Sequence, residues 1–212
     1  MQSDLQLIAI EGHDGTGKTT LAKSLAEAIG AVYLRPFAPP WGDFLMWISS
    51  QNPDSLMTSG KTLIDYAVDK FLMEETNAQS AVSRLRKTNG RSVPIICDRH
   101  WLTVSSLITL QDTALYEDLD DGQLLIIKDI IDKSWLFKPP TLLCYANLDT
   151  TLLRLNQRND PAEQACSIAY HKYYINLYFK LAHEYNVKIV DTNYLNEADS
   201  LKCAVEWVES LV

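Results

Sequence analysis

The chain has 212 residues, of which 47% are hydrophobic and 22% are charged, and its formal net charge is −8. This length suits one α/β domain with a sizeable core, and we expect residues 1–212 to form a single domain. The acidic balance argues against a nucleic-acid partner, because binding to a phosphate backbone requires a basic face. Basic residues placed locally would have to bind any anionic ligand.

Other classes are disfavoured by the distribution of residues. The apolar stretches all fall well short of the roughly 20 residues of a membrane span, and the first four residues, Met-Gln-Ser-Asp, lack the basic segment of a secretory signal. Four widely spaced cysteines form no C-x-x-C pair, which favours buried thiols over disulfides or a zinc site. They are Cys97, Cys144, Cys166 and Cys203. We therefore expect a cytoplasmic enzyme with no membrane partner.

Short apolar segments alternate with longer helical patterns along the chain, which favours a parallel sheet with crossover helices. The predicted strands cover residues 5–10, 31–34, 93–97, 141–148 and 188–190. The predicted helices cover residues 18–30, 62–86, 116–134, 149–158 and 161–185. The segment Asn159-Asp160-Pro161 separates the last two predicted helices, and a mobile segment is expected there.

The first predicted strand and helix enclose the phosphate-binding pattern G-x-x-x-x-G-K-[ST] at residues 12–19. Its glycines permit positive φ, so that consecutive backbone amides converge on phosphate oxygens. Lys18 would place an ammonium beside the β and γ phosphates, Thr19 offers a hydroxyl ligand for Mg²⁺, and the helix directs its positive end at the anion. The predicted nucleotide-binding residues are Gly12, His13, Asp14, Gly15, Thr16, Gly17, Lys18, Thr19 and Thr20.

Two further groups of charged residues follow predicted strands. Asp98 ends the third strand, where a carboxylate can hold Mg²⁺ directly or through water, so Thr19 and Asp98 are the predicted metal ligands. Arg99 would project from the same edge toward a second phosphate. Arg154 and Arg158 are four residues apart and share one helix face, where two guanidinium groups could neutralise a moving phosphoryl group. An ordinary surface Asp-Arg pair and a solvated basic helix face are the alternatives.

These motifs resemble those of the thymidylate kinases, or at least of the thymidylate-kinase-like branch of the nucleoside monophosphate kinases. The matching segments are Ile10 to Thr20, Asp98-Arg99-His100 and Arg154-x-x-x-Arg158, and their order spans nearly the whole chain. The resemblance implies a three-layer P-loop NTPase sandwich with a five-stranded parallel sheet and a small helical lid around residues 154–165. It also implies a possible homodimer.

The resemblance further implies individual roles. Asp14 would organise the acceptor end of the site, and Lys18, with Arg154 and Arg158 of the lid, would neutralise charge on the ATP phosphates. The implied acceptor-binding residues are Arg35, Tyr66, Lys70 and Arg99, with Tyr66 stacked on the acceptor base. Tyr66 as a core residue and Lys70 as a solvated one remain the alternative.

The expected activity is Mg²⁺-dependent transfer of the γ-phosphoryl group of ATP to a nucleoside monophosphate, with dTMP to dTDP as the first choice. Three departures concern the acceptor: the loop after Arg35 reads Pro-Phe-Ala-Pro-Pro where the family has x-Pro-Gly, Lys70 replaces the usual arginine, and residues 101–111 do not match the segment that recognises thymine. A nucleoside kinase, or another small-molecule kinase with a hydroxyl acceptor, is the alternative, and it would depend more on Glu11 or Asp14. A regulatory nucleotide switch is disfavoured, because no Asn-Lys-x-Asp segment is present.

Overall fold

The computed structural model describes residues 7–35, 93–103, 138–159 and 166–211, together with residues 121, 122, 125, 128, 129 and 132. Five strands form one sheet in the order β2-β3-β1-β4-β5, and every neighbouring pair is parallel. The strands are β1 (Leu7–Glu11), β2 (Val32–Leu34), β3 (Ile95–Asp98), β4 (Thr141–Tyr145) and β5 (Lys188–Asp191). All five predicted strands are confirmed, with their ends shifted by a few residues.

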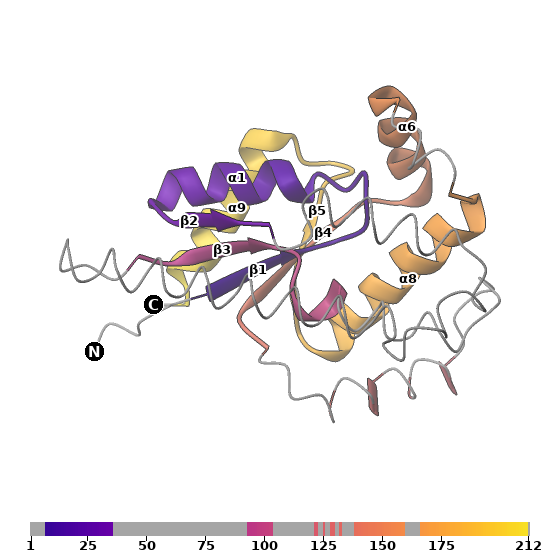
Figure 1. Cartoon of the computed structure of the whole chain (residues 1–212), viewed down its shortest axis with the longest axis horizontal. Helices are drawn as coiled ribbons and strands as arrows, with labels where there is room; N and C mark the ends of the chain where they lie inside the picture. Colours follow the sequence, from indigo (N-terminus) through magenta and orange to yellow (C-terminus); the bar gives the residue numbers. More distant parts are fainter. Residues whose placement is uncertain are drawn as a thin grey trace, which may run out of the picture.

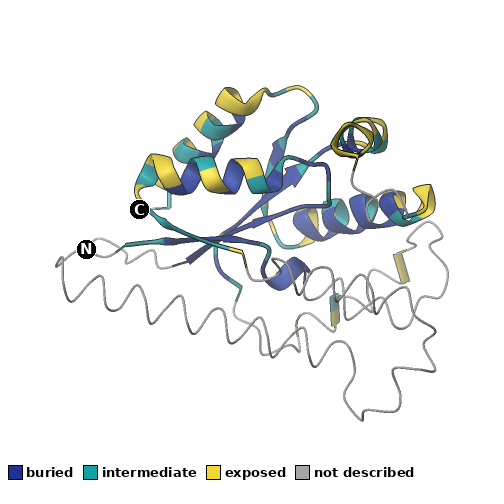
Figure 2. Cartoon of the chain, turned by 45° about the horizontal axis from the view of Figure 1, so that its top comes forward, coloured by how far each residue is buried: buried dark blue, intermediate teal, exposed yellow. Residues whose placement is uncertain are grey.

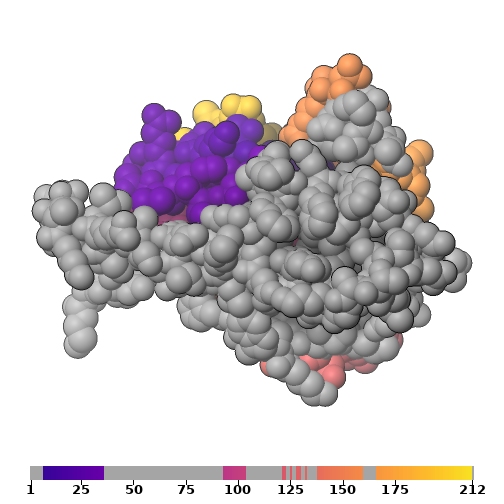
Figure 3. Space-filling model, viewed as in Figure 1, coloured from indigo at the N-terminus to yellow at the C-terminus, as the bar shows by residue number. Residues whose placement is uncertain are grey.

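Helices cover both faces of this sheet (Figure 1). The helices whose bounds are described are α1 (Lys18–Ile29), α6 (Leu148–Arg158), α8 (Ile168–Glu184) and α9 (Glu197–Glu209). Helices α1 and α9 contact each other on one face of the sheet, and α8 packs against β4 on the other face (Figure 2). The predicted three-layer arrangement is therefore present, and α1, α6 and α9 reach the molecular surface (Figure 3).

Because both faces are covered, the central strands are apolar along almost their whole length. Every residue of β1 and β3 is buried. The side chains of Ile8, Ile10 and Ile96 pack with one face of α1 in one hydrophobic cluster. The polar exceptions, Glu11 and Asp98, are the last residues of these two neighbouring strands, so two buried carboxyl groups lie at the same edge of the sheet.

Helix α1 differs from the other described helices at its amino end. Asn147, Ser167 and Asn196 cap α6, α8 and α9 with side chains that accept hydrogen bonds from backbone amides. Gly17 precedes α1 and supplies no side-chain cap, so the first amides of α1 remain available to an anion. Gly30 ends the helix with φ of 65°, as the glycine stop predicts.

Several expectations differ from the structure or lie outside the described residues. Helix α9 was not predicted, and α8 begins at Ile168 instead of residue 161. The helix predicted at 62–86 lies outside the described residues, and so does most of the one predicted at 116–134, although the six described positions there are helical. Among the described residues, no helix is long and apolar enough to span a membrane.

The cysteine prediction holds in part. Within the described ranges, which include all four cysteines, no disulfide forms. Cys97 and Cys144 are buried in β3 and β4, as expected for core thiols, whereas Cys166 and Cys203 are half-buried. The prediction of four buried thiols is wrong for these two residues, because they lie before α8 and on α9, where only one face of each helix meets the core.

Candidate active site

The loop at residues 12–17 connects β1 to α1 at the carboxyl edge of the sheet, where open α/β folds bind their ligands. The Thr16 hydroxyl donates a hydrogen bond of 2.7 Å to the carbonyl oxygen of His13, and Thr192 Oγ1 donates one of 2.9 Å to the carbonyl oxygen of Thr16. Gly12, Gly15 and Gly17 all have positive φ, as the motif predicts. The loop is therefore held in the shape of a phosphate cradle.

Gly12 allows the closest approach in this loop. A Cβ atom built on it would lie 2.5 Å from the backbone oxygen of Cys144 and 2.8 Å from Thr16 Oγ1, and its φ is 145°. The neighbouring strand β4 thus passes directly behind the loop. Any side chain at this position would have to displace a backbone carbonyl, so glycine is required by both space and conformation.

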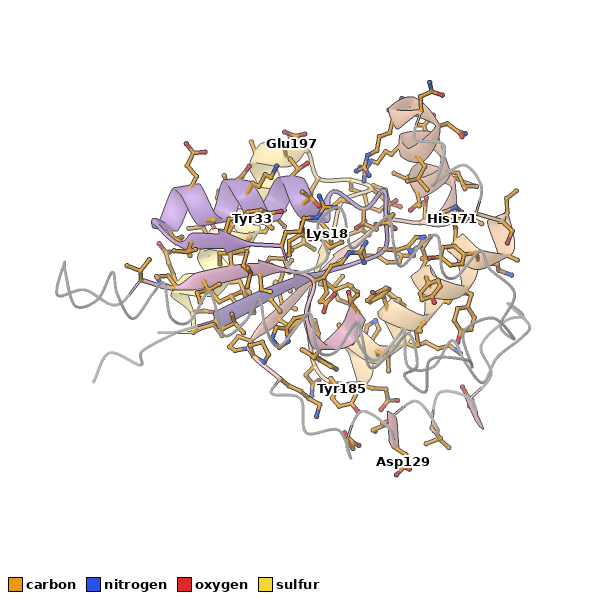
Figure 4. All side chains as sticks on the ribbon, viewed as in Figure 1. Lys18, Tyr33, Asp129, His171, Tyr185 and Glu197 are labelled. Carbon is orange, nitrogen blue, oxygen red and sulfur yellow. The ribbon has the colours of Figure 1, made fainter. Side chains whose placement is uncertain are left out.

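Lys18, Thr19 and Asp98 meet at the start of α1, where Figure 4 labels Lys18. Lys18 Nζ lies 3.5 Å from Asp98 Oδ1, and Thr19 Oγ1 donates a 2.7 Å hydrogen bond to Asp98 Oδ2. Burial, followed by repulsion from Arg99, lowers the pKa of Lys18. Burial would raise the pKa of Asp98, but Lys18 and the hydrogen bond from Thr19 lower it below its usual range, so this carboxylate stays ionised at neutral pH.

These residues fit a magnesium ion. Asp98 Oδ1 is buried and has no hydrogen-bond partner among the described residues, which leaves one carboxylate oxygen for a cation or its water. Thr19 donates its proton to Asp98, so the lone pairs of its oxygen remain available as a ligand. Mg²⁺ prefers such hard oxygen ligands, and proteins commonly hold it with one or two side chains plus nucleotide phosphates.

Asp14, in the phosphate loop, and Arg99, directly after β3, form an ion pair between Asp14 Oδ1 and Arg99 Nη2. The side chain of Asp14 is 35% exposed and that of Arg99 is 16% exposed, so the pair faces accessible space. Burial would raise the pKa of Asp14, but Arg99 and then Lys18 hold it well below its usual range. Arg99 has φ of 82°, a strained conformation for a non-glycine residue, and its amide donates to the Ile10 carbonyl.

Glu11 is fully buried and holds the turn that follows β3. Its Oε1 accepts hydrogen bonds from the amides of His100 (2.7 Å) and Thr103 (3.2 Å), and Oε2 accepts one from the Thr103 hydroxyl (2.6 Å). Tyr178 on α8 contacts the same hydroxyl at 3.0 Å. Burial raises the pKa of Glu11, although these hydrogen bonds oppose the rise. Glu11 thereby positions the segment that carries Arg99.

His13 points from the loop into a buried aromatic cluster on α8. Its Nε2 lies 2.8 Å from His171 Nδ1, and its ring is parallel to that of Tyr174 with centroids 5.7 Å apart. One of these two nitrogens must donate and the other accept, so the two rings cannot both be positively charged imidazolium ions. Burial lowers the pKa of His13 to about 3. The neighbouring tyrosines of α8 also pack inside the protein: Tyr173, Tyr174 and Tyr178 are buried, and the Tyr178 hydroxyl contacts Thr103.

We predict that acid destabilises the protein through His13. Its pKa is near 6.5 ordinarily and about 3 in the fold, so between these values the unfolded chain binds more protons. The part of the free energy of unfolding that His13 contributes is therefore largest above pH 6.5, and it falls on acidification below that pH by about 1.4 kcal/mol per pH unit. Denaturant titrations of the wild type and His13→Asn between pH 5 and 7 test this, because the variant should lose that part of the slope. Equal slopes of the free energy of unfolding against pH in the two proteins would contradict this prediction.

Helix α6 carries both arginines of the predicted lid. Arg154 Nη1 donates to the Gly15 carbonyl (3.2 Å) and to Thr192 Oγ1 (3.0 Å), and its Nη2 donates to the Thr192 carbonyl (2.7 Å). Arg154 therefore links the phosphate loop to the turn after β5. Arg158 lies close enough to lower the pKa of Asp14. Arg154 contacts the loop directly, and residues 160–165 of the predicted lid lie outside the described residues.

The other predicted acceptor-binding residues are only partly described. Arg35 Nε lies 3.8 Å from Asp98 Oδ2, whereas Tyr66 and Lys70 lie outside the described residues. Thr103, Tyr178, His171, Thr192 and Tyr33 contact the site and were not predicted. No local pattern marks these residues, because each is brought to the site by an element distant in sequence.

Comparisons with known proteins concern the fold. No family model and no curated protein matches the chain. Deoxyadenosine kinase from M. mycoides with bound dATP superposes with a TM-score of 0.60 at 15% identity, covering 96% of this chain and 99% of that chain. The same enzyme with dCMP and dCDP gives a TM-score of 0.56 at 16% identity, covering 98% and 100%. YorR from Bacillus subtilis, in complex with phosphorylated GDP, gives 0.50 at 18% identity, covering 96% of each chain.

The chain has a three-layer P-loop NTPase fold. At these identities the likeness shows the fold alone, and one fold hosts many functions. The function therefore has to be argued from the residues of the site itself.

Proposed function

We propose that this protein is an ATP-dependent kinase that phosphorylates the hydroxyl group of a nucleoside, with deoxynucleosides as the first candidates. The observation that carries this proposal is the ion pair between Asp14 and Arg99 beside the phosphate loop. Asp14 is ionised and partly exposed beside the phosphate loop, and in this proposal the acceptor approaches the γ-phosphate next to it. A carboxylate can accept the proton of a hydroxyl group, whereas it repels an incoming phosphate.

The charges of the neighbouring arginines favour the same choice. A monophosphate acceptor would require unneutralised cations, yet Arg99 is paired with Asp14, and Arg35 lies 3.8 Å from Asp98. The fold likeness to deoxyadenosine kinase from M. mycoides adds support from an independent direction. Asp14 is preferred to Glu11 as the hydroxyl-binding carboxylate, because Glu11 is fully buried and both of its oxygens accept hydrogen bonds from the protein.

In this proposal the chain's residues act by position and charge. The loop amides bind the ATP phosphates, Lys18 neutralises charge on the transferred phosphoryl group, and Asp14, held by Arg99, orients the acceptor hydroxyl and takes its proton. Thr19 and Asp98 would hold Mg²⁺, which when bound supplies charge neutralisation on the phosphates. Arg154 would keep the loop in shape through its hydrogen bond to Gly15, while Arg158 would add positive charge near Asp14.

Phosphorylation of dTMP to dTDP is the second candidate. It is favoured by the Asp98-Arg99-His100 segment and by Arg154 and Arg158 on one helix, which resemble thymidylate kinase motifs. In that case the acceptor phosphate would have to displace Asp14 from Arg99. A nucleotide switch, the least favoured alternative, would bind and hydrolyse nucleotide without an acceptor.

An acceptor screen separates these functions. ADP release from ATP is measured with each deoxynucleoside, ribonucleoside and their monophosphates, and products are identified by chromatography, with an acceptor-free reaction as control. We expect nucleosides to give monophosphates. Conversion of dTMP to dTDP with no turnover of nucleosides would replace our proposal by the second candidate, and acceptor-independent hydrolysis alone would support the switch.

A further inference from the structure

Tyr33 contacts the carboxylate that the phosphate-loop motif pairs with Thr19. Its hydroxyl donates a hydrogen bond of 2.9 Å to Asp98 Oδ2, the oxygen that also accepts from Thr19 at 2.7 Å. The two donors come from different elements, β2 and α1. The other oxygen, Oδ1, has no hydrogen-bond partner among the described residues and lies 3.5 Å from Lys18 Nζ. Two hydroxyl donors thus share Oδ2, whereas Oδ1 has Lys18 as its ion-pair partner and accepts no hydrogen bond from the described residues.

The sheet register explains why a tyrosine reaches this carboxylate. Tyr33 is level with Ile96 in the parallel pairing of β2 and β3, so Asp98 lies two residues further along its neighbour strand, roughly 6.6 Å away along the strand. A long side chain is needed to bridge this distance. Val32 and Leu34 pack on the opposite face of the sheet, in a separate hydrophobic cluster, while Tyr33 packs on the α1 face.

Helix α1 completes the arrangement around the ring. Thr19 and Lys23 are four residues apart and share one helix face, so the face that brings the Thr19 hydroxyl to Asp98 also brings Lys23 to Tyr33. Lys23 Nζ lies 5.8 Å from the centroid of the Tyr33 ring. A cation near the ring face interacts favourably with the aromatic system, and here it holds the phenol beside the helix.

We propose that Tyr33 is a positioning residue for the magnesium-nucleotide site, which fixes the Asp98 carboxylate so that Oδ1 faces the metal and Thr19 keeps its oxygen available as a ligand. Two donors on one oxygen restrict rotation of the carboxylate about its Cβ–Cγ bond. With the Tyr33 hydroxyl removed, Thr19 is the single remaining hydroxyl donor to Asp98 in the described part of the chain, and the carboxylate can turn toward Lys18 or Arg35. Groups that orient metal-binding residues commonly change metal affinity about 10- to 100-fold when they are removed.

Binding of ADP tests this inference without any acceptor or turnover. Isothermal titration calorimetry on the full chain measures the ADP dissociation constant with excess Mg²⁺ and with EDTA, for the wild type, Tyr33→Phe and Tyr145→Phe. Tyr145 ends β4, and its ring packs against Phe179, so Tyr145→Phe removes a tyrosine hydroxyl at the same sheet edge without touching Asp98. Thermal unfolding of each variant reports stability.

We expect Tyr33→Phe to weaken binding about 10-fold in Mg²⁺ and by less than about 2-fold in EDTA, and Tyr145→Phe to change neither constant. Equal changes in both conditions, or no change in a folded Tyr33→Phe variant, would overturn the inference and assign Tyr33 to packing alone. The inference rests on the nucleotide-binding half of the proposed function. If the wild type binds no ADP in either condition, both the proposed function and the role of Tyr33 are overturned. If the wild type binds ADP and Tyr33→Phe binds it equally well, only the role of Tyr33 is overturned.

Discussion

Replacement of Lys18 by alanine is expected to reduce phosphoryl transfer by at least about 100-fold, because it removes a cation that acts on the developing charge of the transferred group. The buried ammonium also lies 3.5 Å from Asp98 Oδ1, so the site loses the charge that balances this carboxylate. The rate constant kcat with a responsive acceptor, measured by ADP release, is the readout. Full activity in a well-folded Lys18→Ala variant would contradict the proposed function.

A matched variant separates chemistry from folding. Lys18→Met keeps the aliphatic stem of the buried side chain and removes only the charge, so its melting temperature should stay closer to the wild type than that of Lys18→Ala. Because burial already lowers the pKa of Lys18, loss of the ammonium removes a desolvation penalty together with its attraction to Asp98. Both variants should be equally inactive.

Substitution of the Asp14–Arg99 pair is expected to impair handling of the acceptor more than binding of ATP. Asp14→Asn removes the carboxylate that would take the hydroxyl proton, and a positioned general base is worth about 100-fold or more in rate. We therefore expect kcat for a nucleoside to fall by about that factor, with the ADP dissociation constant little changed. Steady-state kinetics with the acceptor varied, together with calorimetry, measure both quantities.

Arg99→Ala and Glu11→Gln are the comparison variants for Asp14→Asn. Arg99→Ala should raise the acceptor KM and lower kcat, because Asp14 loses the partner that holds it in place. Glu11→Gln retains most of the buried shape at the turn after β3 and should reduce kcat much less than Asp14→Asn. A folded Glu11→Gln variant with the larger loss would assign the base role to Glu11, and an unchanged Asp14→Asn combined with a severe Arg99→Ala defect on dTMP would favour the monophosphate kinase.

The parts of the site that were predictable are those encoded by residues close together in sequence. The phosphate loop and α1 follow from glycine spacing, Lys18 and a helical pattern within about twenty residues, and all five strands follow from short apolar runs. Asp98 was predictable because it is a charged residue at the end of such a run. Parallel strands then bring their carboxyl ends to one edge, so its proximity to Thr19 also followed.

The contacts that were missed connect distant segments. Tyr33 and Asp98 are 65 residues apart, Glu11 and Thr103 are 92 apart, and His13 and His171 are 158 apart. Each of these polar residues, taken alone in sequence, has the properties of a packing or surface residue. The C-terminal helix α9 was also missed, although Asn196 caps it. In the structure, α9 packs against α1.

The sequence by itself determined a nucleotide-phosphate loop, a parallel α/β sheet and the charged residues at its carboxyl edge, because backbone conformation and hydrophobic periodicity act over a few neighbouring residues. Only the tertiary structure decided how those charges pair. Asp14 holds Arg99, Arg154 binds the loop carbonyl of Gly15, and Asp98 keeps one oxygen open. Such pairing depends on distances of a few ångströms between separate elements, which packing of the helices on the sheet sets.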